Sequence, residues 1–398
     1  MKKLLLLSVL FGMLLIAGCF HDKGAPTPAP APAPEPTPAP APQPTAPPPA
    51  AKEPLKVGYV GPLTGDAAVY GIPLQRSYAL AIKEVNAKGG VNGKQLELVS
   101  EDGKCTSSDA ATAAQKLINV DNVKLIFGGV CSSETLGMAP IAEQADIVVL
   151  SPSSTSPEVT TAGDFIFRVA PSDALGGEKL AAYAAKNGWK RAGIINEQKD
   201  FPAAYAQAFK KSFTAKGGIV VTQETFTSEE TDVSAQALKL KTFNPDVIFV
   251  VTQTPAKSAM VLKKIKSLNI NKPILGGEVE ILPDTIKEAG NAAEGVVGAR
   301  AKFDEEDPSV QEFLSKYESE YNEKNEVGYY SVLARDSVYL VADAIKKGNY
   351  GGEALRDYLY SVNEWPGMIG PITIDQNGDS VLDYDILKVK DGKASKVE

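Results

Sequence analysis

The sequence predicts an α/β protein in which two lobes enclose a cleft. From Leu55 onward, short apolar stretches alternate with longer stretches whose apolar residues recur at helical spacing, as in β-α-β units with parallel sheets. Roughly 340 residues of this alternation exceed the size of one typical domain. Because ligands of open α/β sheets bind beyond the carboxyl ends of the strands, we expect a binding site in the loops that follow the strands.

The strands are predicted from short runs rich in apolar residues. These runs cover residues 56–60, 96–100, 124–127, 147–151, 165–169, 192–196, 219–223, 247–251 and 273–276. The stretch after the first run shows how helices are predicted. Its apolar residues repeat at helical spacing until two glycines end the helix: Leu74, Tyr78, Ala81, Ile82 and Val85, then Gly89 and Gly90.

The first 18 residues have the composition of a secretory signal. Lys2 and Lys3 precede an apolar run, residues 4–17, that is too short to cross a bilayer comfortably as a helix. Residues 15–19 then resemble the lipobox that lipoprotein signal peptidase cuts. This resemblance implies that Cys19 becomes the first residue and carries a lipid anchor. The alternative is an ordinary signal peptide that is cleaved elsewhere and takes the cysteine with it.

A tether is predicted between the anchor and the folded part. Residues 25–51 are nearly alternating alanine and proline, a composition that favours extended polyproline II and cannot bury a core. We therefore assign residues 1–18 to the signal peptide and residues 19–53 to the anchor and tether. At about 3.1 Å per residue, the tether can hold the folded part up to roughly 80 Å from the lipid.

Composition excludes several classes of function. The chain has 41 basic and 49 acidic residues, a net charge of −8, which argues against nucleic acid as a partner. Its single histidine, His21, lies in the predicted tether, so the folded part has none for a Ser-His-Asp triad or a multi-histidine zinc site. The glycines at 61–65 fit neither the dinucleotide fingerprint nor the P-loop. We expect no metal and no cofactor.

The two remaining cysteines are predicted to form a disulfide. Cys105 and Cys131 are the only cysteines beyond Cys19, and two remaining thiols of an exported protein are more often bridged than free. In the chain-entropy model, closing a loop of this size stabilises the fold by roughly 3 kcal/mol.

Three polar segments that follow predicted strands are candidates for a ligand site. In residues 128–134, glycines allow close backbone approach, and Ser132 or Ser133 can offer a hydroxyl and amides at a positive helix end. Residues 151–158 expose hydroxyls and carbonyls, and Glu278 places a carboxylate at a strand end, where it could receive an ammonium. The simpler interpretations are a helix cap, a turn whose hydroxyls bind local backbone, and a surface acid.

Several segments resemble branched-chain amino acid binding proteins, which are type I periplasmic binding proteins. Residues 57–71 read VGYVGPLTGDAAVYG and residues 89–93 read GGVNG. The resemblance covers the whole chain beyond the tether and continues through Glu101, Asp102, Cys105, residues 129–133, residues 151–158, Gly370, Pro371 and residues 375–379.

The resemblance implies a specific division of the fold. It predicts two Rossmann-like lobes with parallel-rich sheets flanked by helices, joined by three crossovers near Val169, Arg300 and Pro371. Lobe 1 is then formed by residues 54–169 with 302–371, and lobe 2 by residues 170–301 with 372–398.

The resemblance also assigns ligand-binding groups. In the family, the α-carboxylate is held by the residues that match Ser132 and Thr155. The α-ammonium meets the carbonyl that matches Ser153, the hydroxyl of Thr155 and the carboxylate that matches Glu278. A disulfide links the positions of Cys105 and Cys131 in these proteins. Such a set is physically reasonable because both charges of a zwitterion must be paired when water is removed.

The side-chain pocket is expected to decide which amino acid binds. The family uses aromatic residues that correspond to Tyr70 in the first lobe and Phe201 in the second, although core packing would also explain both. Gln253 stands where these proteins often have a tyrosine, and its amide could accept a polar side chain.

The function implied is that of an exported, lipid-anchored binding protein. Its lobes would close on an amino acid, with an aliphatic or branched side chain as the first hypothesis, and the loaded form would dock on the permease of an ATP-driven importer. We expect a monomer without enzymatic activity, because the sequence has no G-x-S-x-G elbow and no histidine base in its folded part. The chief alternative is a sensory module for an amino acid or amide, which would need a link to an output.

Overall fold

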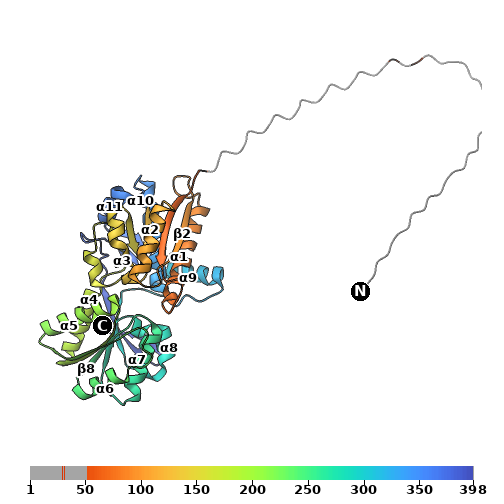
Figure 1. Ribbon diagram of the computed structural model, residues 1–398. Helices are drawn as coiled ribbons and strands as arrows, with labels where there is room; N and C mark the ends of the chain where they lie inside the picture. Colours follow the sequence, from red (N-terminus) through yellow and green to blue (C-terminus); the bar gives the residue numbers. More distant parts are fainter. Residues whose placement is uncertain (1–28, 30, 32–51, 398) are drawn as a thin grey trace, which may run out of the picture. The chain divides into compact units, whose positions relative to one another are not determined.

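The computed structural model describes residues 29, 31 and 52–397, and the last of these ranges forms two lobes, each built on its own sheet (Figure 1). The predicted α/β class with parallel-rich sheets is confirmed. The predicted signal peptide, Cys19 and nearly all of the tether lie outside the described residues. Within residues 52–397, no helix is long and apolar enough to cross a membrane.

Lobe 1 is built on a five-stranded sheet in the order β2-β1-β3-β4-β5, in which all neighbouring strands are parallel. Its strands are β1 (Leu55–Gly61), β2 (Leu96–Asp102), β3 (Leu125–Gly128), β4 (Val148–Ser151) and β5 (Ile166–Arg168). The intervening helices are α1 (Ala68–Ala87), α2 (Ser107–Asn119), α3 (Ser132–Gln144) and the 3-10 turn η1 (Pro157–Thr161). Strands β3 and β4 are wholly buried, which explains why they read as continuous apolar runs.

Lobe 2 is built on a seven-stranded sheet in the order β14-β13-β10-β9-β8-β6-β7. The strands from β7 to β10 are parallel, whereas β13 and β14 are antiparallel additions at one edge. The strands are β6 (Arg191–Glu197), β7 (Ile219–Phe226), β8 (Val247–Val251), β9 (Ile274–Gly276), β10 (Val297–Ala301), β13 (Tyr384–Lys390) and β14 (Lys393–Lys396). Its helices are α4 (Asp173–Lys186), α5 (Asp200–Ala215), α6 (Ser234–Phe243), α7 (Pro255–Ser267) and α8 (Pro283–Ala289), with the turns η2 (Val279–Ile281) and η3 (Gly290–Ala292).

A later part of the chain returns to lobe 1. It comprises α9 (Pro308–Tyr321), α10 (Gly328–Lys346), α11 (Gly352–Tyr360) and the short pair β11 (Trp365–Gly367) and β12 (Gly370–Ile372). Helix α10 packs along α1, and the hydroxyl of Tyr350 donates to the carbonyl of Lys56 in β1. Figure 1 accordingly shows α9, α10 and α11 beside α1 and β2, apart from α5 to α8.

The chain therefore passes between the two sheets three times. The first passage joins β5, which ends at Arg168, to α4, which begins at Asp173, and the second joins β10 to α9. The third precedes β13, and it lies downstream of Pro371 because Gly378 still accepts a backbone hydrogen bond from Arg168 of β5. The contacts of residues 375–379 thus place that turn beside lobe 1, while the proposed lobe boundaries remain predictions.

Each of the nine predicted strands overlaps a strand of the structure, with ends that differ by at most three residues. The structure adds five strands, β10 to β14, that were not among them. β13 lies between β10 and the edge strand β14, and buried and exposed residues alternate near its end, so it lacks the continuous apolar run that marks the central strands.

The disulfide involves one of the segments predicted to bind a ligand, because Cys131 belongs to residues 128–134 of lobe 1. The structure joins Cys105 to Cys131 with the two Cα atoms 5.3 Å apart. Cys131 immediately precedes α3, and Cys105 follows β2. The bond therefore ties the loop after β2 to the start of α3. Glu134 reinforces this link because its carboxylate accepts hydrogen bonds from the amides of Cys105 at 3.0 Å and Cys131 at 2.9 Å.

Candidate ligand-binding site

One cavity is lined by both lobes and has a volume of about 490 Å³, including the part open to solvent. All seven residues predicted to bind a ligand line it. Tyr70, Ser132, Ser153 and Thr155 come from lobe 1, and Phe201, Gln253 and Glu278 come from lobe 2. The structure therefore brings together residues from segments that are far apart in the sequence, although their individual roles remain predictions.

Ser132 lies at the first position of α3 and is almost completely buried. Its hydroxyl oxygen accepts a hydrogen bond from the amide of Ser156 at 3.2 Å, which leaves the hydroxyl proton free to donate. The first amides of a helix have no partner within the helix and carry its positive end. This corner of the cavity is therefore suited to a carboxylate.

The loop after β4 is locked onto the loop after β3 by its serines. The hydroxyl of Ser151 donates to the carbonyl of Gly129 at 2.7 Å and accepts from the amide of Ser154 at 2.9 Å. Ser154 donates to the same carbonyl at 2.9 Å, and Ser153 donates to the carbonyl of Val130 at 2.9 Å. Several hydroxyls of this loop therefore bind nearby backbone, as the simpler interpretation of residues 151–158 predicts. The locked loop still places Thr155 and Ser153 at the cavity wall.

Thr155 links the cavity to the first passage between the lobes. Its carbonyl accepts from the amide of Asp173 at 2.9 Å, and its side chain hydrogen-bonds to the carboxyl of Asp173. Burial raises the pKa of that carboxyl to about 7, even though the bonds from Thr155 and Tyr384 act to lower it. Asp173 begins α4 of lobe 2, so these contacts join the ligand loop of lobe 1 to lobe 2.

Glu278 supplies the negative charge of the cavity. It follows β9, and its carboxylate accepts a hydrogen bond from the hydroxyl of Tyr330 on α10 at 2.9 Å. Glu278 is half-buried between the lobes, and this burial raises its pKa, while the charge of Arg300 and the bond from Tyr330 act in the opposite direction. Because α10 belongs to lobe 1, this hydrogen bond connects the two lobes directly at the site.

Tyr70 is held at the wall by a close approach of α1 to the loop after β1. A side chain at Gly71 would come within 1.9 Å of the carbonyl oxygen of Pro62, so only glycine permits this approach. The carbonyl of Gly71 also accepts from the hydroxyl of Tyr59 at 2.6 Å. Tyr70 is 7% exposed, and no protein group bonds to its hydroxyl in the described part of the chain. That hydroxyl is available to a ligand.

Phe201 and Gln253 form the facing wall in lobe 2. The ring of Phe201, on α5, lies 6.0 Å from the ring of Tyr205. Gln253 is fixed by its backbone amide, which donates to Glu197 at 2.8 Å. The side-chain amide of Gln253 reaches across to the sulfur of Cys131 at 3.8 Å, a long and weak contact that a polar ligand group could replace.

The sequence interpretation missed part of the lining. Tyr330 was not predicted, and neither were the apolar residues Leu74, Val130, Val279 and Leu282. Leu74 belongs to the helical apolar stripe of α1, so its spacing indicated burial without indicating a cavity. Tyr330 lies 52 residues from its partner Glu278, and no local pattern distinguishes it from the neighbouring Tyr329.

The cavity thus combines two polar ends, one of them charged, with an apolar section. Hydroxyls and helix amides gather at Ser132 and Thr155, a carboxylate stands at Glu278, and aliphatic and aromatic side chains fill much of the remaining wall. A small zwitterion with an apolar side chain matches this distribution.

Comparison with known proteins decides the family. A family model described as periplasmic binding protein matches residues 54–394. The chain belongs to this family. A relative from Pseudomonas aeruginosa, a leucine-, isoleucine-, valine-, threonine- and alanine-binding protein, is 28% identical over 333 residues, which cover 83% of this chain and 88% of the relative.

Solved structures of the family share the fold. A leucine-binding protein from Thermotoga maritima is 28% identical and has a TM-score of 0.78, with 86% of this chain and 98% of that chain covered. A branched-chain amino acid transporter substrate-binding protein from Streptococcus pneumoniae, solved in complex with isoleucine, is 27% identical, with a TM-score of 0.76 and the same coverage. The two-lobed architecture is therefore that of type I periplasmic binding proteins.

The interlobe hydrogen bond yields the first testable prediction. Tyr330→Phe removes a donor that lowers the pKa of Glu278, so we expect this pKa to rise further because the ionised carboxylate loses a hydrogen bond. Titration of the glutamate carboxyl carbons by NMR measures the shift. Tyr329→Phe is the matched control, because no protein group bonds to the hydroxyl of Tyr329 in the described part of the chain. An unchanged pKa in Tyr330→Phe would contradict the assignment.

Proposed function

We propose that this chain is an exported substrate-binding protein that captures an amino acid with an aliphatic, branched side chain and delivers it to an ATP-driven importer. The observation that carries the proposal is the meeting of all seven predicted residues at one cavity. The family consists of substrate-binding transport proteins rather than enzymes, and its members compared above are named for the branched-chain amino acids that they bind.

The two ends of the cavity suit the two charges of an α-amino acid. Ser132, at the positive end of α3, and Thr155 would receive the carboxylate. Glu278 would receive the ammonium together with the carbonyl of Ser153. Charge-assisted hydrogen bonds to fixed groups are the strong ones, and they replace the water that each charge loses on binding.

The middle of the cavity suits an apolar side chain. Leu74 and Val130 come from lobe 1, and Val279, Leu282 and Phe201 come from lobe 2. Burying an aliphatic side chain among these residues contributes roughly 1.5 to 3 kcal/mol. Gln253 and Tyr70 add polar groups at the wall, so a small hydroxyl on the ligand would also find partners.

Closure of the lobes would signal that the site is loaded. Because Glu278, Phe201 and Gln253 belong to lobe 2, the complete site exists only when the lobes are together. The loaded form would dock as a monomer on permease subunits whose cytoplasmic ATPase supplies the energy. This role needs neither a cofactor nor a catalytic group in the chain itself.

Calorimetric titration tests the proposal. The chain is produced from residue 20 onward, stripped of carried ligand by denaturation and refolding, and titrated with the twenty amino acids. We expect leucine, isoleucine or valine to bind tightest. Glu278→Gln should weaken binding by roughly 2 to 5 kcal/mol, or 30-fold and more, because the ammonium loses its ionic partner. Glu353→Gln, on the exposed side of α11, is the control and should bind normally. Absence of binding by every amino acid would overturn the proposal.

The raised pKa of Glu278 predicts how affinity depends on pH. The ammonium pairs with the ionised carboxylate, so protonation of Glu278 competes with the ligand. We expect a constant Kd above this raised pKa and a Kd that rises by about tenfold per pH unit below it. Titrations between about pH 4 and pH 8 measure this profile. In Glu278→Gln the rise of Kd at low pH should disappear. If the variant keeps the pH dependence of the wild-type protein, another group is responsible for it.

The anchor at Cys19 is also part of the proposal, although it lies outside the described residues. Diacylglycerol linked to the thiol of Cys19 would hold the protein at the cell envelope. In cells fed radiolabelled palmitate, we expect the protein to carry the label and to fractionate with membranes. Cys19→Ser should abolish both, and Cys105→Ser, which leaves the lipobox intact, should retain the label. A labelled Cys19→Ser protein would refute the anchor.

A further inference from the structure

We propose that Arg168 is a positioning residue for ligand binding: it fixes the backbone of the ligand loop, residues 151–157, and ties that loop to two of the three passages between the lobes. The inference rests on the proposed function in so far as this loop binds the ligand. It concerns a residue that does not itself line the cavity and that acts through Thr155.

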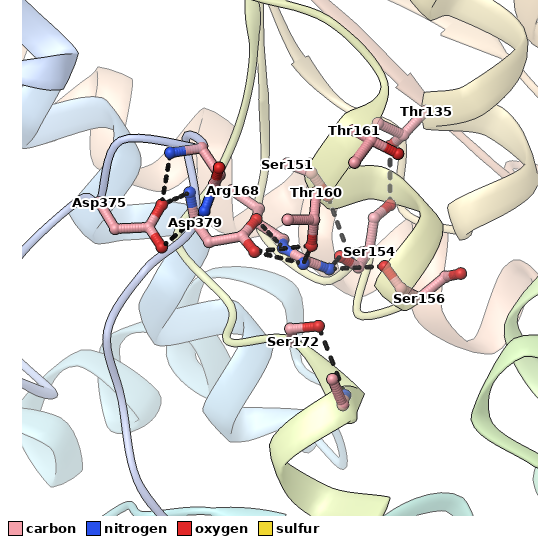
Figure 2. A network of polar contacts seen from close by, with 12 residues as sticks. Thr135, Ser151, Ser154, Ser156, Thr160, Thr161, Arg168, Ser172, Asp375 and Asp379 are labelled. Atoms are coloured by element: carbon pink, nitrogen blue, oxygen red, sulfur yellow. Dashed lines mark hydrogen bonds and ion pairs between the residues drawn. The ribbon is translucent and has the colours of Figure 1, made fainter. Parts of the chain in front are cut away.

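The side chain of Arg168 is fully buried and uses every donor that it has. Its Nε and Nη2 atoms donate to the two carboxylate oxygens of Asp379 at 2.7 and 2.8 Å. Nη2 also donates to the hydroxyl of Thr160 at 2.7 Å, and Nη1 donates to the carbonyls of Ser154 at 3.0 Å and Ser156 at 2.8 Å. Figure 2 shows these bonds converging on the guanidinium.

The two carbonyl contacts lie on either side of Thr155. Because Ser154 and Ser156 are its neighbours in the chain, their fixed carbonyls define the direction of the backbone through Thr155. The hydroxyl of Ser132 adds a third constraint by accepting from the amide of Ser156. The position of Thr155 at the cavity wall therefore depends on the guanidinium.

The other partners of Arg168 belong to the passages between the lobes. Arg168 is the last residue of β5, directly before the chain leaves for α4. Asp379 lies in the turn that precedes β13, and this turn is closed by Asp375, whose carboxylate accepts from the amides of Asn377 at 2.8 Å and Asp379 at 3.0 Å. The amide of Arg168 donates to the carbonyl of Gly378 at 3.0 Å. Two passages and the ligand loop thus meet at one side chain.

Only arginine has the geometry for this task. The guanidinium presents five N–H groups in a rigid planar fork, and all five are used here. Lysine would keep the charge next to Asp379, but its three donors cannot serve a carboxylate, a hydroxyl and two carbonyls at once. Arg168→Lys therefore retains the positive charge next to Asp379 but loses hydrogen bonds that position the loop.

Arg168→Lys in the full chain is the decisive variant, and Arg335→Lys is its matched control. Arg335 pairs with Asp336, a fully buried carboxylate, on α10. Two measurements are made on each variant: amide hydrogen exchange of residues 153–156, and calorimetric titration with leucine. Thermal melting records the stability that each variant loses.

We expect Arg168→Lys to speed exchange in residues 153–156 by about tenfold or more and to weaken leucine binding by a similar factor. Arg335→Lys should leave both unchanged. Should Arg168→Lys fail to fold, Asp379→Asn tests the same link, with smaller effects in the same direction. If Arg168→Lys lowers the melting temperature but changes neither loop exchange nor affinity, Arg168 is only structural and the inference is wrong.

The two proposals fail in different ways. If the wild-type protein binds no amino acid, the proposed function fails, and the amide exchange of residues 153–156 still decides whether Arg168 positions the loop. If the wild-type protein binds leucine and Arg168→Lys binds it equally well, the function stands and the inference falls.

Discussion

A carboxylate that is half-buried between two lobes, with no cation bonded to it among the described residues, is the constraint around which the site is organised. Glu278 receives a hydrogen bond from the neutral hydroxyl of Tyr330, while Arg300, the cation whose charge acts on it, is paired with Glu305. An enclosed carboxylate is costly unless it is paired, and the raised pKa of Glu278 reflects this cost. An ammonium entering the cavity would remove it. The proposed pairing with an ammonium therefore follows from the environment of one side chain.

The two lobes contribute different groups to the binding site. In lobe 1, the hydroxyls of Ser151 and Ser154 are used on the carbonyl of Gly129, so the two ligand loops form one rigid surface with Ser132 and Thr155 facing the cavity. Lobe 2 contributes the counter-charge and part of the apolar wall. A ligand held only by lobe 1 would have one charge paired, and closure would pair the second. Lobe movement and recognition are then the same event, which suits the proposed delivery of the ligand to an importer.

The fold was more predictable than the site. Central strands such as β3 and β8 are buried on both faces, and their uninterrupted apolar runs reveal them. The lining of the cavity was predicted mainly through the family resemblance, because spacing alone left Ser132, Thr155 and Glu278 open to simpler interpretations. Tyr330 and Arg168 could not be found in this way: their partners Glu278 and Asp379 lie 52 and 211 residues away in the chain. Such pairs are set by tertiary packing, which one sequence does not display.

The central claim is that the site recognises both charges of an amino acid. The most direct measurement compares the affinity of the protein for leucine, N-acetyl-leucine and leucinamide, which share one side chain and differ in their charged groups. The account predicts that leucine binds and that both derivatives lose most of its affinity, because one lacks the ammonium that Glu278 pairs and the other the carboxylate that Ser132 and Thr155 receive. Binding of N-acetyl-leucine as tight as that of leucine would contradict it.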